Sequence, residues 1–167
     1  MRTGLLFVLL LALAPAVHAQ QSRVGGPLRA TDLVEWRARI VAGEAPGEAR
    51  YVVEATVAEG WRLYGTQSQA GIPLAVTFGT LPEGVARQGA LRESRTSDGV
   101  DEVLGLPYAY HIGSARLAQG LRVDRRATGR HRIPVQVRFA VCDDSVCLPP
   151  TTVDLAATLS VGQGSHN

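Results

Sequence analysis

The sequence predicts an all-β protein that folds as an immunoglobulin-like antiparallel β-sandwich. Three observations support this: apolar and polar residues alternate with a period of two in most segments, turn formers separate these segments, and no segment has a long helical period. Strict alternation places one set of side chains on a buried face and the other set in water. Several such strands joined by polar turns are typical of two packed sheets.

Five segments carry the alternating pattern most clearly. Their apolar sets are Val34, Trp36, Ala38 and Ile40; Tyr51, Val53, Ala55 and Val57; Leu74, Val76 and Phe78; Ile133, Val135, Val137, Phe139 and Val141; and Val153, Leu155, Ala157, Leu159 and Val161. Pro134 lies on the polar side of the fourth segment. Because proline cannot donate to a sheet ladder, its position predicts an edge strand or a β-bulge.

Turn formers occupy the intervals between strands. They lie at residues 43–47, 65–71, 79–84, 119–120 and 128–129. Residues 87–107 are less regular and rich in charge, and they contain the run SDGVDEVLGLP. This stretch predicts a long loop, and long loops in compact domains are usually functional or disordered.

The N-terminus has the features of a secretory signal peptide. Arg2 precedes an apolar run from Leu5 to Ala14, and Val17-His18-Ala19 presents small residues suited to cleavage after Ala19. A membrane anchor is the alternative, but the run is shorter than the roughly 20 residues needed to span a bilayer. We therefore expect an exported protein that does not span the membrane after cleavage.

The expected organisation is a signal peptide over residues 1–19, a flexible leader over 20–29, one domain over 30–162 and a disordered tail over 163–167. Removal of residues 1–19 from the 167 residues leaves 148, which suits one domain with a full core. The formal net charge of +2 falls to +1 without Arg2. Such a balance argues against nucleic acid as a partner.

The two cysteines, Cys142 and Cys147, lie together in the stretch VCDDSVCLPP. A bridge across so short a loop contributes about 2 kcal/mol in the chain-entropy model, against about 5 kcal/mol for a long loop. Thiol–disulfide exchange, in contrast, needs an accessible sulfur and a second sulfur close by, which a short loop supplies. Pro149 and Pro150 lack a backbone N–H and would hold the loop open.

The residues alone leave two alternatives to a redox pair. The cysteines can form a static staple, or they can bind zinc or copper, for which the further ligands His111, His131 and His166 form no closely spaced pair. Asp143 and Asp144 are either solvated turn residues or carboxylates that disfavour a neighbouring thiolate. We expect no metal and no other cofactor.

Residues 142–150 resemble the active-site loop of a known family, the N-terminal periplasmic domain of the thiol:disulfide interchange protein DsbD. A second similarity lies upstream, in GWRLY at Gly60–Tyr64 followed by GIPL at Gly71–Leu74. The resemblance runs from about residue 49 to residue 161. The immunoglobulin-like fold of that family agrees with the period-two pattern.

The resemblance implies a periplasmic protein that passes electrons between a membrane-linked thiol reductase and oxidised thioredoxin-like proteins. Cys147 would form the mixed disulfide with a partner, and Cys142 would resolve it. The family protein continues into membrane helices and a thioredoxin-like domain that this chain lacks, so the reductase would be a separate protein. Whether the chain is itself an enzyme stays open, and the alternative is a noncatalytic sandwich that binds an envelope protein and carries a structural disulfide.

The resemblance also implies supporting residues around the sulfurs. The family's cap loop would correspond to Asp101, Glu102, Val103 and Leu104, with Val103 in place of a shielding phenylalanine. A smaller side chain would cover less of the disulfide. Tyr64 matches an aromatic residue near the family's disulfide, and an ordinary half-buried strand tyrosine is the alternative.

Overall fold

The computed structural model describes residues 27–162. The predicted signal peptide, residues 20–26 of the predicted leader, and the predicted tail lie outside the described residues. In chain order the elements are α1 (Ala30–Leu33), β1 (Val34–Ala42), β2 (Glu48–Val57), β3 (Arg62–Tyr64), β4 (Ala75–Phe78), β5 (Val85–Glu93), β6 (Ser97–Val100), β7 (Pro107–His111), β8 (Ser114–Val123), β9 (Gly129–Phe139), β10 (Val141–Cys142) and β11 (Thr151–Val161).

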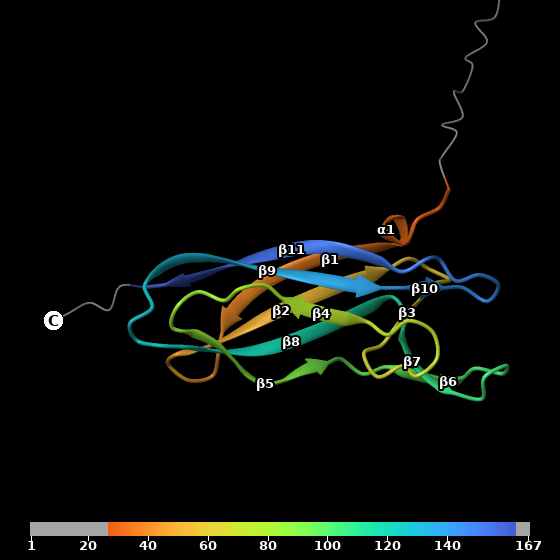
Figure 1. Cartoon of the computed structure of the whole chain (residues 1–167), viewed down its shortest axis with the longest axis horizontal. Helices are drawn as coiled ribbons and strands as arrows, with labels where there is room; N and C mark the ends of the chain where they lie inside the picture. Colours follow the sequence, from red (N-terminus) through yellow and green to blue (C-terminus); the bar gives the residue numbers. More distant parts are fainter. Residues whose placement is uncertain (1–26, 163–167) are drawn as a thin grey trace, which may run out of the picture.

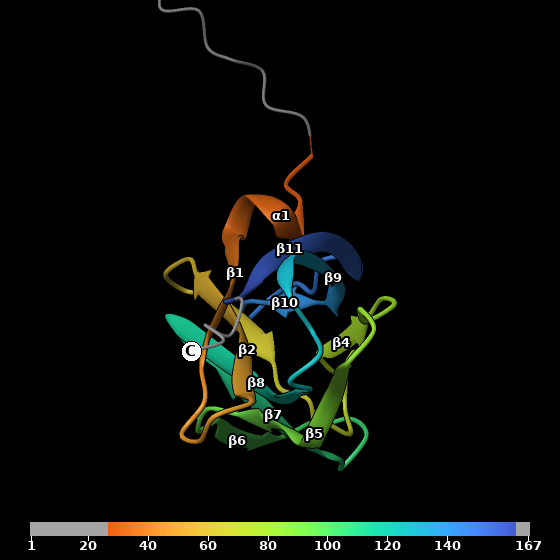
Figure 2. The same ribbon diagram turned by 90° about the vertical axis from the view of Figure 1, so that its left-hand side faces the viewer.

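Two antiparallel sheets form the layers of the sandwich. One has the strand order β1-β2-β8-β5 and the other has the order β11-β9-β4, and β1 packs along β11 at one side. Figure 1 shows the long strands running side by side, and Figure 2 shows the two layers from one end. The predicted fold class, an immunoglobulin-like antiparallel sandwich, is confirmed.

The core lies between the apolar faces of these sheets. In β9 the alternation is complete, because Ile133, Val135, Val137 and Phe139 are buried while Pro134 and its alternate neighbours are exposed. Tyr51 from β2 crosses the core and donates its hydroxyl to the carbonyl oxygen of Ile133 at 3.1 Å. Burial raises the pKa of Tyr51 to about 12. The phenol therefore stays neutral and tied to the opposite layer.

A small third sheet closes one end of the sandwich, with the order β10-β3-β7-β6. Its strands β3, β7 and β6 are close in the chain to β2, β8 and β5, and they keep the same order. Strand β10 comes from the other layer, two residues after β9, and pairs with β3. Figure 1 shows these short strands gathered at one end of the molecule. The stretch with both cysteines is thereby attached to the first layer.

The predicted turn at Gln119–Gly120 is wrong, because both residues lie inside β8. Gln119 is buried, and its side-chain amide donates to the carbonyl oxygens of Gln88 and Gly89 in β5 at 3.1 and 3.0 Å. A Cβ on Gly120 would lie 2.6 Å from the carbonyl oxygen of Gln88. The pair allows β5 to approach β8 closely at the register shift in their pairing.

The predicted long loop over residues 87–107 is also largely wrong. Most of it forms β5 and β6, and the irregular parts are residues 94–96 and 101–106. Strand β5 lies at the edge of its sheet, and most of its side chains are exposed, so it lacks an alternating pattern. Edge strands of this kind are hard to recognise from hydrophobic periodicity.

The edge position or β-bulge predicted at Pro134 is wrong as well, since β9 is the central strand of its sheet and its pairing with β11 continues past Pro134 without a register shift. The pairing of β4 with β9 ends at Phe78 and Val135, one residue short of the proline. The carbonyl oxygen of Pro134 then accepts a bond from the Gly79 N–H at 3.0 Å. Pro134 is tolerated because it lies where the ladder with β4 ends.

Candidate thiol–disulfide site

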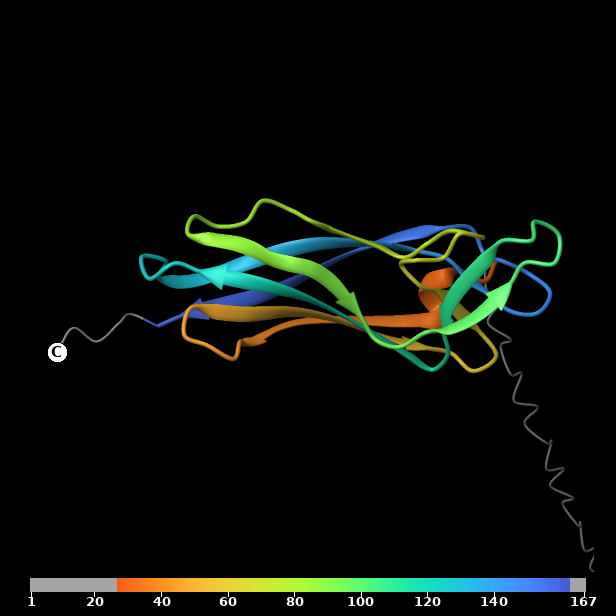
Figure 3. The same ribbon diagram turned by 90° about the horizontal axis from the view of Figure 1, so that it is seen from below.

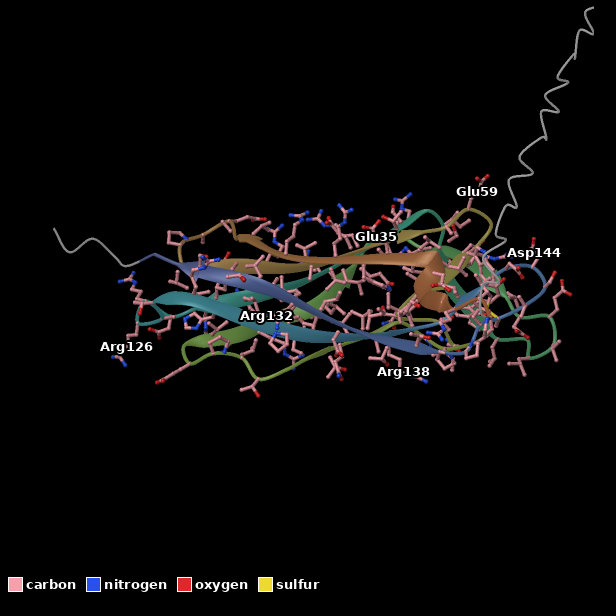
Figure 4. All side chains as sticks on the ribbon, turned by 90° about the horizontal axis from the view of Figure 1, so that it is seen from above. Glu35, Glu59, Arg126, Arg132, Arg138 and Asp144 are labelled. Atoms are coloured by element: carbon pink, nitrogen blue, oxygen red, sulfur yellow. A yellow bond between two sulfur atoms is a disulfide. The ribbon has the colours of Figure 1, made fainter. Side chains whose placement is uncertain are left out.

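Cys142 and Cys147 form a disulfide at the end of the sandwich closed by the small sheet. Cys142 belongs to β10 and is 6% exposed, whereas Cys147 lies in the following loop and is exposed. Figure 4 shows Asp144, from the same loop, at the end of the molecule where the sulfur bond lies. Cys147 is therefore accessible from solvent, whereas Cys142 is shielded by this chain.

The loop between the cysteines is a tight turn built by Asp143. Its carboxylate accepts the backbone N–H groups of Ser145 and Val146, both at 2.7 Å, and its own N–H donates to the carbonyl oxygen of Val146 at 3.0 Å. These backbone hydrogen bonds lower the pKa of Asp143. Asp143 therefore holds the turn, which is one of the two uses predicted for this carboxylate.

The outer face of the small sheet brings several side chains to the disulfide. Arg62 pairs with Cys142 across β3 and β10, and Tyr64 pairs with Tyr110 across β3 and β7. Because directly paired residues of an antiparallel ladder point to the same side, and residues two apart on one strand also do, these side chains share one face. Arg62 and Tyr64 thus flank Cys142 from β3.

The Tyr64 hydroxyl lies beside both sulfurs. Its oxygen is 3.5 Å from Sγ of Cys142 and 4.0 Å from Sγ of Cys147. A disulfide carries no S–H, so the phenol is the donor in either contact. Burial, followed by the neighbouring Tyr108 and Asp101, raises the pKa of Tyr64. The hydroxyl therefore stays protonated at neutral pH and can donate a hydrogen bond to a sulfur atom.

Three tyrosine rings form a cluster on this face. The ring centroids of Tyr64 and Tyr108 are 5.8 Å apart in an edge-on arrangement, and those of Tyr108 and Tyr110 are 5.6 Å apart. Gly71 has φ +76°, and a Cβ there would lie 2.5 Å from the Tyr64 ring. Gly71, which opens the GIPL segment, thus allows the chain to pass close to the ring beside the sulfurs.

The predicted cap-loop residues lie at the turn between β6 and β7, at the same end of the molecule as the cysteines (Figure 3). The carboxylate of Asp101 accepts the N–H groups of Val103 and Leu104 at 3.0 and 2.8 Å. Glu102 is exposed, and Val103 and Leu104 are 92% and 62% exposed. Asp101 is close enough to raise the pKa of Tyr64, whereas Val103 projects into solvent. The cap role of these residues stays a prediction.

Arg62 lies within the GWRLY segment and has no role predicted from the sequence. In the structure Arg62 forms an ion pair with Asp144 of the cysteine loop, and its guanidinium lies 5.8 Å from the centre of the Tyr110 ring. The ion pair joins β3 to the loop between the two cysteines. An arginine two residues before Tyr64 in a strand is the signal that could have placed it on this face.

The opposite face of the small sheet contains a buried polar cluster that no sequence pattern predicted. His111 Nε2 lies 2.9 Å from the Glu93 carboxylate, which also accepts the backbone N–H of Thr66 at 3.0 Å and its hydroxyl at 2.5 Å. Burial tends to raise the pKa of Glu93, but the hydrogen bonds from His111 and Thr66 outweigh it and lower the pKa. These bonds connect β5, β7 and the segment after β3.

The histidines considered as metal ligands do not gather at the cysteines. His111 contacts Glu93, and His131 Nε2 lies 2.8 Å from the carbonyl oxygen of Thr128. His166 lies outside the described residues. Over residues 27–162, no three side chains of histidine, cysteine, aspartate or glutamate are grouped so as to hold a metal ion.

Comparisons with known proteins give structural likenesses only. No family model matches the chain, and no curated protein matches it either. The reduced DsbD N-terminal domain of Neisseria meningitidis is 18% identical with a TM-score of 0.49, covering 81% of this chain and 91% of that one. The N-terminal periplasmic domain of ScsB from Proteus mirabilis is 14% identical with a TM-score of 0.48, covering 74% of this chain and 44% of that one.

These likenesses leave membership of the DsbD family a prediction. Between residues 27 and 162, no helix has the length and apolar character needed to cross a bilayer.

Proposed function

We propose that this protein is a thiol–disulfide exchange protein that uses Cys142 and Cys147 as its redox pair. The observation that carries the proposal is the asymmetry of the bridge. Cys147 is exposed and open to attack, whereas Cys142 is buried on the face that carries Tyr64. Exchange needs one accessible sulfur and one that is held close enough to resolve the mixed disulfide.

The proposed exchange has two steps, which together conserve electrons and protons. In the reduced protein, the Cys147 thiolate attacks a disulfide of the partner, forming a mixed disulfide and releasing one partner sulfur as a thiolate. The Cys142 thiolate then attacks Sγ of Cys147, the mixed bond breaks, and the second partner sulfur leaves as a thiolate. The partner has gained two electrons and its thiolates take up two protons, while Cys142 and Cys147 are again bridged.

A separate protein dithiol must restore the reduced form. We propose a membrane-linked thiol reductase as this donor and oxidised thioredoxin-like proteins of the periplasm as acceptors. The predicted signal peptide over residues 1–19 supports the compartment, where disulfides persist. The exposed loop supports direct contact with another protein, because Cys147 is reachable without opening the sandwich.

Trapping of the mixed disulfide tests the proposal. Cys142→Ser leaves the exposed Cys147 without its resolving partner, and we expect it to accumulate a mixed disulfide with oxidised periplasmic thioredoxin-like proteins. The matched control is Cys147→Ser, in which the buried Cys142 should trap far less. Absence of a trapped complex through Cys147, with the variant folded, would count against exchange.

A static disulfide is the second candidate function, and the ordered turn of Asp143 favours it. That turn fixes the loop by two hydrogen bonds from backbone N–H groups to the Asp143 carboxylate and one between backbone groups. In this case the protein is a noncatalytic sandwich that binds an envelope protein. A reduction potential below about −300 mV is typical of structural bridges, whereas exchange proteins have higher potentials. Redox titration of the intact protein therefore separates the two.

A further inference from the structure

Arg62 is a cation on the same face of the small sheet as the buried Cys142. It is the cross-strand neighbour of Cys142 in the pairing of β3 with β10. Its side chain is 28% exposed, while the Asp144 carboxylate that pairs with it is 92% exposed. Most of the Arg62 side chain is therefore covered at this end of the sandwich, and its counter-charge is in solvent.

The other charged and titratable groups of this face are phenols and carboxylates. They are Tyr64 on β3, Tyr108 and Tyr110 on β7, Asp101 in the turn before β7, and Asp143 and Asp144 in the cysteine loop. Each of these carboxylates disfavours a thiolate nearby, whereas the positive charge of Arg62 favours one. A redox cysteine here needs that compensation.

We infer that Arg62 stabilises the thiolate form of Cys142, and that Asp144 weakens this effect by pairing with Arg62. The inference rests on the proposed exchange function and assigns charge control of the resolving sulfur to an ion pair. Arg62 acts through Cys142 and does not touch the partner.

The step affected is the one in which charge develops on Cys142. When a donor thiolate attacks Cys147, the Cys142–Cys147 bond breaks and its electron pair stays on Cys142 as a thiolate. In the opposite direction, this thiolate is the nucleophile that closes the bridge. A cation beside Cys142 makes it a better leaving group and increases the fraction that is ready to attack.

The test measures Cys142 by itself, in the full chain carrying Cys147→Ser. The thiolate fraction is followed by ultraviolet absorbance and by the rate of alkylation across the pH range. Adding Arg62→Gln should raise the pH of half-ionisation by about one unit, which is about tenfold less thiolate at a pH below that point. Arg62→Lys keeps the charge and should restore most of the thiolate fraction.

Asp144→Asn gives the decisive comparison, because it breaks the same ion pair from the other side. If charge acts on Cys142, this variant should lower the pH of half-ionisation, by a smaller amount because an exposed carboxylate is screened. If the ion pair only holds the loop in place, both Arg62→Gln and Asp144→Asn should move the titration in the same direction. That result, or no movement in either variant, would overturn the inference.

These measurements need no partner protein, so they are independent of the trapping experiment. Opposite shifts in the two variants, combined with no mixed disulfide at Cys147, would retain the role of Arg62 and reject the exchange function. Trapping without opposite shifts would retain exchange and reject the role of Arg62. Circular dichroism of each variant checks that the sandwich is intact.

Discussion

The two faces of the small sheet β10-β3-β7-β6 are formed by the same strands and have different composition. Towards the core, Leu63 lies between Val141 and His111, and all three are buried. Towards the outside, Arg62 and Tyr64 lie beside Cys142. Alternation along a strand of three residues thus separates packing from sulfur chemistry. Stability and reactivity at this end should therefore respond to different substitutions.

Leu63→Ala should have the largest effect on stability. Leu63 has no solvent exposure, and truncating a fully buried leucine removes its transfer free energy and leaves a cavity. We expect the free energy of unfolding in urea to fall by about 2–5 kcal/mol. Leu104→Ala is the matched control, because Leu104 is 62% exposed and its loss should change stability by less than about 0.5 kcal/mol. Equal losses in the two variants would refute the inward assignment of Leu63.

Glu93→Gln should have the next largest effect, through the buried cluster with His111 and Thr66. The amide can no longer accept from both partners as the carboxylate does, so a buried group loses a charge-assisted hydrogen bond. We expect a loss of about 1–3 kcal/mol in unfolding free energy near neutral pH. Glu59→Gln, on an exposed turn, is the control and should be nearly neutral (Figure 4).

The same variant should change how stability depends on pH. The pKa of Glu93 is lower in the folded protein than its ordinary value of 4.5, so the ionised group stabilises the fold above that value. This contribution is lost as the pH falls below 4.5 and through the folded pKa. In Glu93→Gln this part of the acid dependence should be absent. If the unfolding free energy of Glu93→Gln, measured in urea, fell with pH below 4.5 as it does in the unmodified protein, the role of ionised Glu93 in stability would be contradicted.

The sequence predicts which side chains of the long strands face the core, but it does not predict the small sheet. The set Ile133, Val135, Val137 and Phe139 alternates over a full strand, and its burial follows directly from period two. Strand β3 has three residues, too few for any period to be detected. Strand β10 has two, and its pairing with β3 joins residues about 80 positions apart in the chain.

The same limit explains what was missed at the site. The cysteines and Tyr64 were predicted because each lies in a short motif of neighbouring residues. Arg62 and Asp144 meet only because β10 pairs with β3, and Glu93 meets His111 only because β5 and β7 reach the same end of the sandwich. Contacts of this kind depend on register between distant segments, which no local pattern specifies.

Tyr64→Phe should have the smallest effect on stability and a clear effect on the disulfide. The ring and its packing against Tyr108 are kept, and only the hydroxyl that lies 3.5 Å from Sγ of Cys142 is removed. We expect the unfolding free energy to change by less than about 1 kcal/mol. The sulfur that leaves as a thiolate loses a hydrogen-bond donor, so reduction by dithiothreitol should slow by about tenfold.

Tyr108→Phe is the control for this last change. Its ring packs against Tyr64, but among residues 27–162 its hydroxyl makes no hydrogen bond to either sulfur. If the Tyr64 hydroxyl acts on the disulfide, only Tyr64→Phe should slow reduction. If both variants slow reduction of the disulfide equally, the tyrosines act by covering the sulfurs. The outer face of the small sheet would then differ from its core face only in its exposure to solvent. If neither variant slows it, Tyr64 is an ordinary strand tyrosine with no part in the chemistry of Cys142.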